Sequence, residues 1–175
     1  MPTLEQLTKS AKLVVVARVE EIAPEPRVTD GNFTGVRALN WEKRVATARV
    51  LEVWKGTAAG ETVQFRASKS WTCDVSTAIM GETVLLFLTD DPKDSTVMAI
   101  AFNGIGRLPV ERNSILLYSS LLTEEIKALL ALPKETFKHP VEVSILKQEV
   151  QKMMGESAER AKQRTSSDGL ASRKR

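Results

Sequence analysis

The chain has 175 residues, of which 42% are hydrophobic and 27% are charged, a composition typical of one folded domain with or without an appendage. It excludes a wholly disordered chain, and no apolar run approaches the ~20 residues of a membrane-spanning helix. Residues 156–175 contain six basic and three acidic side chains, which accounts for the net charge of +3. Residues 1–155 are therefore balanced, so any bulk attraction for a polyanion resides in the tail.

A helix, a strand and a long connection are predicted in the N-terminal region. Thr3, with Gln6 three residues later, matches a capping box and predicts a helix over residues 3–10. Residues 13–22 alternate and predict the first strand. Its predicted inward face consists of Leu13, Val15, Ala17 and Val19. Residues 23–40 then lack a sustained period, and a loop of that length is a candidate functional segment.

A second strand is predicted from Trp41 to Trp54, and it ends at the Lys55-Gly56 turn. The alternation of this strand breaks at Glu52. A bulge near Leu51 would return Val53 to the interior.

Three further strands complete a predicted barrel. Residues 61–67 place Val63 and Phe65 on one side, and residues 82–89 are apolar on both sides, which predicts a central strand. Residues 96–102 follow a polar turn and form the fifth strand. Five strands of this size indicate a small barrel.

Beyond the barrel, the apolar spacing lengthens and predicts two helices. Thr123 as N-cap and Pro133 as stop bracket a helix over residues 124–132. A second helix is predicted over residues 140–154 and ends near Gly155. The predicted organisation is a barrel domain over residues 1–112, a helical annex over residues 113–155 and a flexible basic tail over residues 156–175.

Five segments of the chain resemble the netrin-like family, which includes the tissue inhibitors of metalloproteinases. They are LVVVARVEEI at 13–22, ARVLEVWKG at 48–56, ETVQFRAS at 61–68, WTCDVSTAIMGETVLLFL at 71–88 and IAFNGIGRL at 100–108, in the family's order. The resemblance implies a five-stranded, OB-fold-like antiparallel barrel, here with a short N-terminal helix and two C-terminal helices. Simple bacterial members are usually exported, so we expect a secreted or periplasmic protein if a signal peptide was removed, and a cytoplasmic one if Met1 is the native start.

Two features of the family are missing. Inhibitory members begin with a cysteine that binds the zinc of the protease, whereas this chain begins Met1-Pro2-Thr3. The family's disulfide partner for the cysteine at Cys73 is also missing, because Phe102-Asn103-Gly104 occupies that region. The resemblance therefore implies the fold and not the inhibitory mechanism.

No catalytic constellation stands out in the sequence. The single cysteine, Cys73, excludes an intrachain disulfide and a thiolate metal cluster, and the single histidine, His139, excludes a site with two imidazole ligands. Cys73 is predicted to be inert, and His139 is predicted to be a surface residue at the start of a helix. We therefore expect a protein that is not an enzyme and has no cofactor.

Aromatic and basic side chains define the predicted binding surface, which includes the loop 23–40 and the turn 68–78. The predicted partner-binding residues are Phe33, Trp41, Lys43, Arg44, Arg66, Lys69 and Trp71. With Trp54 and Phe65, the aromatic members would suit stacking of single-stranded nucleic acid or an oligosaccharide. Aromatic and Arg residues equally dominate protein-binding hot spots, and the balanced charge of residues 1–155 disfavours a nucleic-acid groove.

The sequence thus predicts a non-catalytic protein-interaction or scaffold module. A nucleic-acid or oligosaccharide binder, and a metalloprotease inhibitor without the N-terminal cysteine, are the alternatives. Arg173, Lys174 and Arg175 are predicted tail contacts through which nucleic acid could bind, although so short a run is more often only solubilising. The oligomeric state is left open.

Overall fold

The computed structural model describes the backbone of residues 2–24, 44–67, 78–92, 95–102, 104–130 and 138–171. For residues 158 and 160–171 it describes the backbone alone. Predicted features in the other segments, including most of the loop 23–40 and of the turn 68–78, lie outside the described residues.

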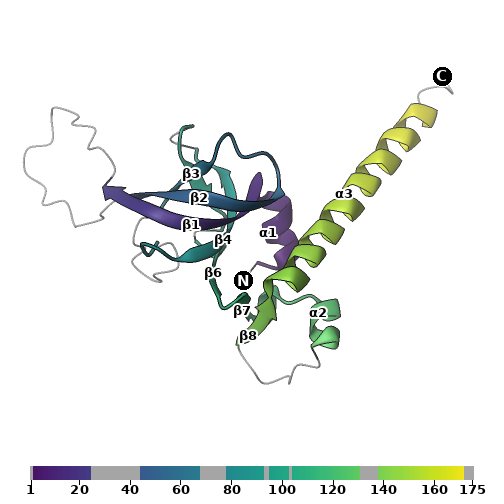
Figure 1. Ribbon diagram of the computed structural model, residues 1–175. Coiled ribbons are helices and arrows are strands. Elements are labelled where there is room, and N and C mark those ends of the chain that lie inside the picture. Colours follow the sequence, from purple (N-terminus) through teal and green to yellow (C-terminus); the bar gives the residue numbers. More distant parts are fainter. Residues whose placement is uncertain are drawn as a thin grey trace, which may run out of the picture.

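Five strands form a closed barrel (Figure 1). They are β1 Leu13–Pro24, β2 Arg44–Lys55, β3 Thr62–Arg66, β4 Thr83–Asp90 and β5 Met98–Ile100. The order is β1-β2-β3-β5-β4, and β4 closes the barrel by pairing with β1. The predicted five-stranded, OB-fold-like barrel is therefore confirmed, but it is not wholly antiparallel, because β3 and β5 pair in parallel at Phe65 and Met98.

Strand β1 separates two apolar cores. Leu13, Val15 and their alternate neighbours face the barrel interior, where they pack with Phe65. Val14 and Val16 point the other way, into a second core that also contains Leu146 of helix α3. Successive side chains of a strand point to opposite faces, so the run of valines in β1 reflects burial on both sides.

Three strands extend the sheet beyond the barrel, in the order β4-β6-β7-β8. They are β6 Arg107–Glu111, β7 Ser114–Tyr118 and β8 Lys138–Glu142. None of the three was predicted, and the helix predicted over residues 140–154 overlaps the end of β8. Strands β6 and β7 form a hairpin whose turn residues, Arg112 and Asn113, have φ angles of 47° and 65°, as a two-residue type I′ turn requires.

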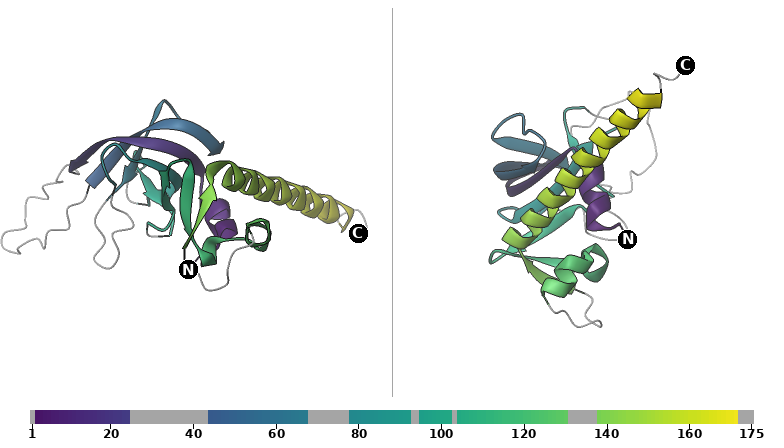
Figure 2. Two further views of the ribbon diagram at one scale, coloured as in Figure 1. Left: turned by 60° about the horizontal axis from the view of Figure 1, so that its bottom comes forward. Right: turned by 90° about the vertical axis from the view of Figure 1, so that its right-hand side faces the viewer.

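The helices are α1 Leu4–Ser10, α2 Glu124–Leu129 and α3 Val143–Ala171, and a short 3₁₀ turn, η2 Ser119–Leu121, precedes α2. The predicted capping box of α1 is confirmed, since Gln6 and Thr3 cap each other reciprocally. Helix α3 was predicted to begin at Pro140 and to end near Gly155, which is wrong at both ends. It runs through Gly155 and projects from the body (Figures 1 and 2).

Within the part of the chain that the structure describes, the helices fall short of the length and apolar character needed to cross a bilayer.

Candidate functional site

Most of the predicted partner-binding residues, and the predicted tail contacts, lie outside the described residues. They are Phe33, Trp41, Lys43, Lys69 and Trp71 of the binding surface, and Arg173, Lys174 and Arg175 of the tail. Cys73 lies outside the described residues as well. Arg44 and Arg66 are described, and they lie close together where β2 begins and β3 ends, because the Ala67 amide donates to the Arg44 carbonyl at 2.9 Å. The Arg66 guanidinium forms an ion pair with Asp91, whose side chain is 4% exposed. Arg66 therefore ties β3 to the end of β4.

Two aromatic residues of the predicted stacking platform are buried. Phe65 lies in the barrel core, and Trp54 is 4% exposed in the second core. The Trp54 indole Nε1 donates to Glu52 Oε2 at 2.9 Å. Neither ring can stack on a ligand, so these two members of the platform were wrongly predicted.

His139 is also buried, at 4% exposure, contrary to the predicted surface position. It lies in β8, and its Nε2 is 3.3 Å from Ser119 Oγ in η2. This pair joins β8 to the turn after β7. Because it is buried, the pair offers no path to a substrate, and we interpret it as structural.

The second half of β2 differs from the predicted arrangement. Pairing of β1 with β2 shifts register near Leu51, as predicted, but it shifts again next to Trp54. Trp54 points into the second core, whereas Leu51 and Val53 are 51% and 41% exposed. Val53 lies opposite Val15 of β1, so the bulge at Leu51 does bring it to the inner face of the strand. It is nevertheless exposed, contrary to the predicted interior position, because β3 no longer pairs with that part of β2.

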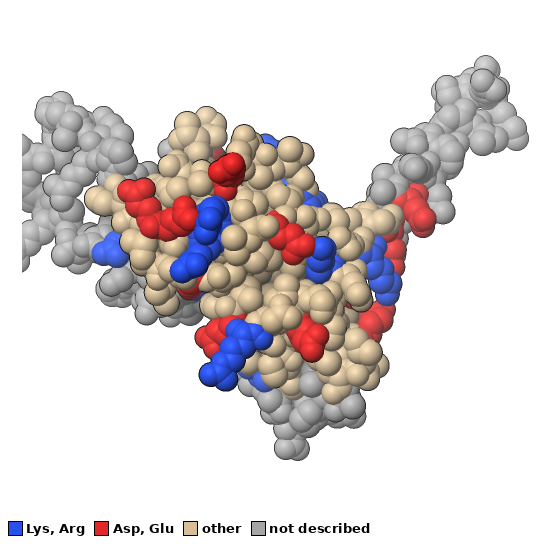
Figure 3. Space-filling view, in the orientation of Figure 1, with Lys and Arg blue, Asp and Glu red and all other residues tan. Residues whose placement is uncertain are grey.

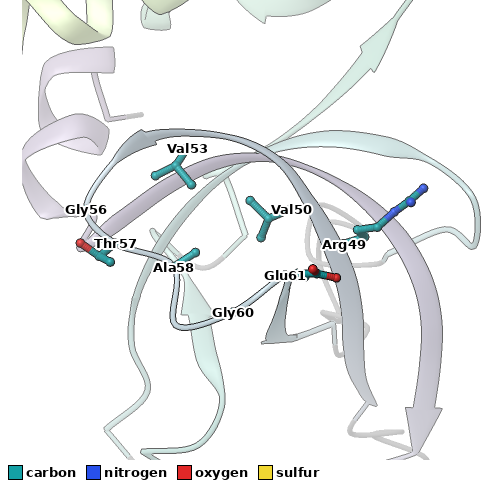
Figure 4. A pocket seen from close by; sticks show the side chains of 8 residues that line it. All are labelled: Arg49, Val50, Val53, Gly56, Thr57, Ala58, Gly60 and Glu61. Atoms are coloured by element: carbon teal, nitrogen blue, oxygen red, sulfur yellow. The ribbon is translucent and has the colours of Figure 1, made fainter.

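An open hollow of about 610 Å³ lies beside this half of β2 (Figure 4). Val50 and Val53 point from β2 into the space bounded by the loop that carries Ala58 and Gly60, and Glu61 lies at its other end. The hollow exists because β3 pairs with β2 only from Val45 to Arg49. After that the Val50 amide donates to the Glu61 carbonyl at 2.8 Å, and the chain turns away.

Lys55 fixes the end of β2 that borders the hollow. Its Nζ donates to the carbonyl of Thr8 at 2.6 Å and to that of Ala11 at 2.5 Å, at the C-terminal end of α1. A cation there complements the helix dipole, although burial lowers the pKa of Lys55. Gly56 follows with φ +78°, and a Cβ there would lie 2.4 Å from the Lys12 carbonyl oxygen.

Glu52 links the same part of β2 to α3. Its carboxylate accepts hydrogen bonds from Lys147 of α3 and from Trp54, and these bonds lower the pKa of Glu52. Together, Glu52 and Lys55 hold β2 against two helices, so the exposed Val53 stands on a strand that is anchored at both sides of it.

The barrel surface does not form a uniformly basic groove. Arg49 pairs with Glu20 at 2.9 Å, and Lys12 pairs with Asp90 at 2.8 Å. In Figure 3, acidic and basic side chains are interspersed over the described part of the face in view. Among the described residues, no group of three or more His, Cys, Asp or Glu side chains is placed to hold a metal ion.

The chain matches no protein-family model, and no curated protein sequence is significantly similar to it. The class defined by the fold is therefore the OB-fold-like barrel, and the netrin-like resemblance stays a prediction.

Proposed function

We propose that this protein is a non-catalytic binding module that takes an extended segment of a protein partner along the second half of β2. The observation that supports this proposal is the exposed side chain of Val53, which lines an open hollow at the point where β3 has stopped pairing with β2. A peptide strand there would add to the sheet through its backbone. Its apolar side chains would enter the hollow against Val50 and Val53.

The dimensions and stiffness of the site suit this mode of binding. Its volume of about 610 Å³ lies within the ~300–1,000 Å³ typical of ligand sites, although it is open to solvent on one side. Strand β2 is held by Lys55 and Glu52, so little ordering entropy is lost when a partner binds.

The alternatives receive less support. A single-stranded nucleic acid needs stacking rings on a positive groove, whereas Trp54 and Phe65 are buried and Arg49 is paired with Glu20. The oligosaccharide and protease-inhibitor alternatives stay predictions that no described feature favours.

The decisive experiment is affinity capture from nuclease-treated extract of the source cell, with the wild-type chain and Val53→Asp as baits. Val53 is 41% exposed, so the aspartate should be tolerated in the fold, which circular dichroism would verify. We expect Val53→Asp to lose the captured protein at least about tenfold, or about 1.4 kcal/mol, because a carboxylate in the hollow must be desolvated when the partner binds.

Leu116→Asp is the matched control, since Leu116 is 52% exposed on β7, a strand outside the barrel. This variant should capture the partner as well as the wild type does. Equal capture by Val53→Asp and wild type would refute the proposed site. Capture that disappears after nuclease treatment would favour the nucleic-acid alternative instead.

A further inference from the structure

A second hollow, of about 340 Å³, lies where α1, α2 and α3 meet, on a part of the molecule that the proposed function does not use. Its apolar lining is Leu121, Leu122 and Met153, and the remaining lining residues are predominantly acidic. We call it the acidic groove. Its carboxylates are Glu5, Glu124, Glu125, Glu149 and Glu156, and Lys152 is the basic residue among the lining residues.

Two carboxylates of the acidic groove have no ion-pair partner among the side chains that the structure describes. They are Glu149, which is half-buried, and Glu156. Glu124 pairs with Lys127 at 2.6 Å, and Glu125 pairs with Lys152 at 3.5 Å.

The remainder of α3, residues 158–171, is here called the arm. It leaves the body as a continuation of the helix whose first half lines the acidic groove (Figures 1 and 2). The sequence of the arm contains Arg160, Lys162 and Arg164 against Glu159 and Asp168, and three further basic residues follow it. A polar helix of this length is marginal in water when nothing packs against it.

The arm cannot reach the acidic groove of its own chain. The arm extends for about 21 Å beyond Ser157 at ~1.5 Å per residue. The four residues that follow it span at most about 14 Å even when fully extended. While α3 stays helical, the backbone of the arm therefore leads away from Glu149 and Glu156.

We propose that a second copy of this chain occupies the acidic groove with its arm, so that two chains associate through antiparallel α3 helices. Glu149 and Glu156 of the groove lie in the proximal half of α3, whereas Arg160, Lys162 and Arg164 lie in its distal half. A two-fold axis near the middle of the helix then places each arm beside the partner's groove. The two contacts are identical and close on each other, so the product is a dimer and not a filament.

The test is a charge swap read by light scattering after gel filtration of the full chain. Wild type should dimerise at about 0.1 M salt and dissociate towards the 19.3 kDa monomer at about 1 M salt, where the screening length falls from about 10 Å to about 3 Å. Reversing the groove, with Glu149→Lys and Glu156→Lys, should raise the dissociation constant at least about tenfold. Reversing the arm, with Arg160→Glu and Arg164→Glu, should do the same.

Mixing the two reversed variants should restore a dimer, because each groove then meets an arm of opposite charge. The control pair Glu21→Lys and Glu111→Lys changes the net charge as the groove reversal does, at exposed positions outside the groove, and should dimerise as the wild type does. Circular dichroism would confirm that α3 persists in each variant. A monomeric wild type at both salt concentrations, or a failure of the mixed variants to pair, would overturn the proposal even if a basic peptide from another protein bound the groove.

Discussion

Replacing Lys55 by methionine removes the ammonium group that joins the end of β2 to α1, while keeping most of the aliphatic side chain. Two short hydrogen bonds are lost, to the carbonyls of Thr8 and Ala11. Hydrogen bonds that involve a charged group contribute about 1.5–3 kcal/mol each, but burial also penalises this ammonium, as its lowered pKa shows. We therefore expect a net loss of about 2 kcal/mol in the free energy of unfolding.

Urea denaturation at neutral pH measures this loss, and thermal unfolding should show a fall of about 4–8 °C in Tm for a chain of this size. Lys9→Met is the matched control, since Lys9 makes an exposed ion pair with Glu5 that should contribute less than about 0.5 kcal/mol. If Lys55→Met were no more destabilising than Lys9→Met, the assignment of Lys55 as the clamp between β2 and α1 would be wrong.

Three further outcomes follow from described contacts. Gly56→Ala should lower the free energy of unfolding by about 1–3 kcal/mol, because Gly56 has φ +78° and a Cβ would meet a backbone oxygen. Urea denaturation measures this loss, and an unchanged midpoint would contradict the close approach. Arg107→Met should cost about 3–5 kcal/mol, since it leaves the nearly buried Glu82 carboxylate without its cation, and adding Glu82→Gln should recover part of that loss. Because Lys147 lowers the pKa of Glu52, the stabilisation from this contact should be fully present above about pH 4.5 and should decrease as Glu52 becomes protonated at lower pH. Lys147→Met should therefore reduce the dependence of the free energy of unfolding on pH in acid-denaturation curves, and an unchanged dependence would refute the linkage.

The local sequence determined those elements whose signals lie within a few residues of one another. The capping box of Thr3 and Gln6 needs no contact outside α1, and the alternation from Leu13 to Val19 gives the inward face of β1. The apolar run from Thr83 to Thr89 indicates the central strand, because only a strand covered on both faces has no polar side. These patterns were sufficient to predict the five-stranded barrel and its helical additions.

Competing short-range signals explain why the sheet extension was missed. Arg112-Asn113 is not the Asn-Gly pair that marks a type I′ turn, and the apolar run before Tyr118 fits a helix as well as a strand. Pro140 suits the first turn of a helix, but an edge strand also tolerates proline. Gly155 costs only about 1 kcal/mol inside a helix, which is too little to end α3.

The candidate site depended on tertiary structure. Val53 lies opposite the buried Val15, on the inner face of β2, yet it is exposed because β3 has stopped pairing with β2 before that point. His139 is buried because β8 pairs with β7, a partner more than fifteen residues away. The sequence by itself therefore determined the barrel, through periodicities that each strand contains alone. Only the packed structure decided which side chains remain outside, because that choice depends on strand register and on partners distant in the chain.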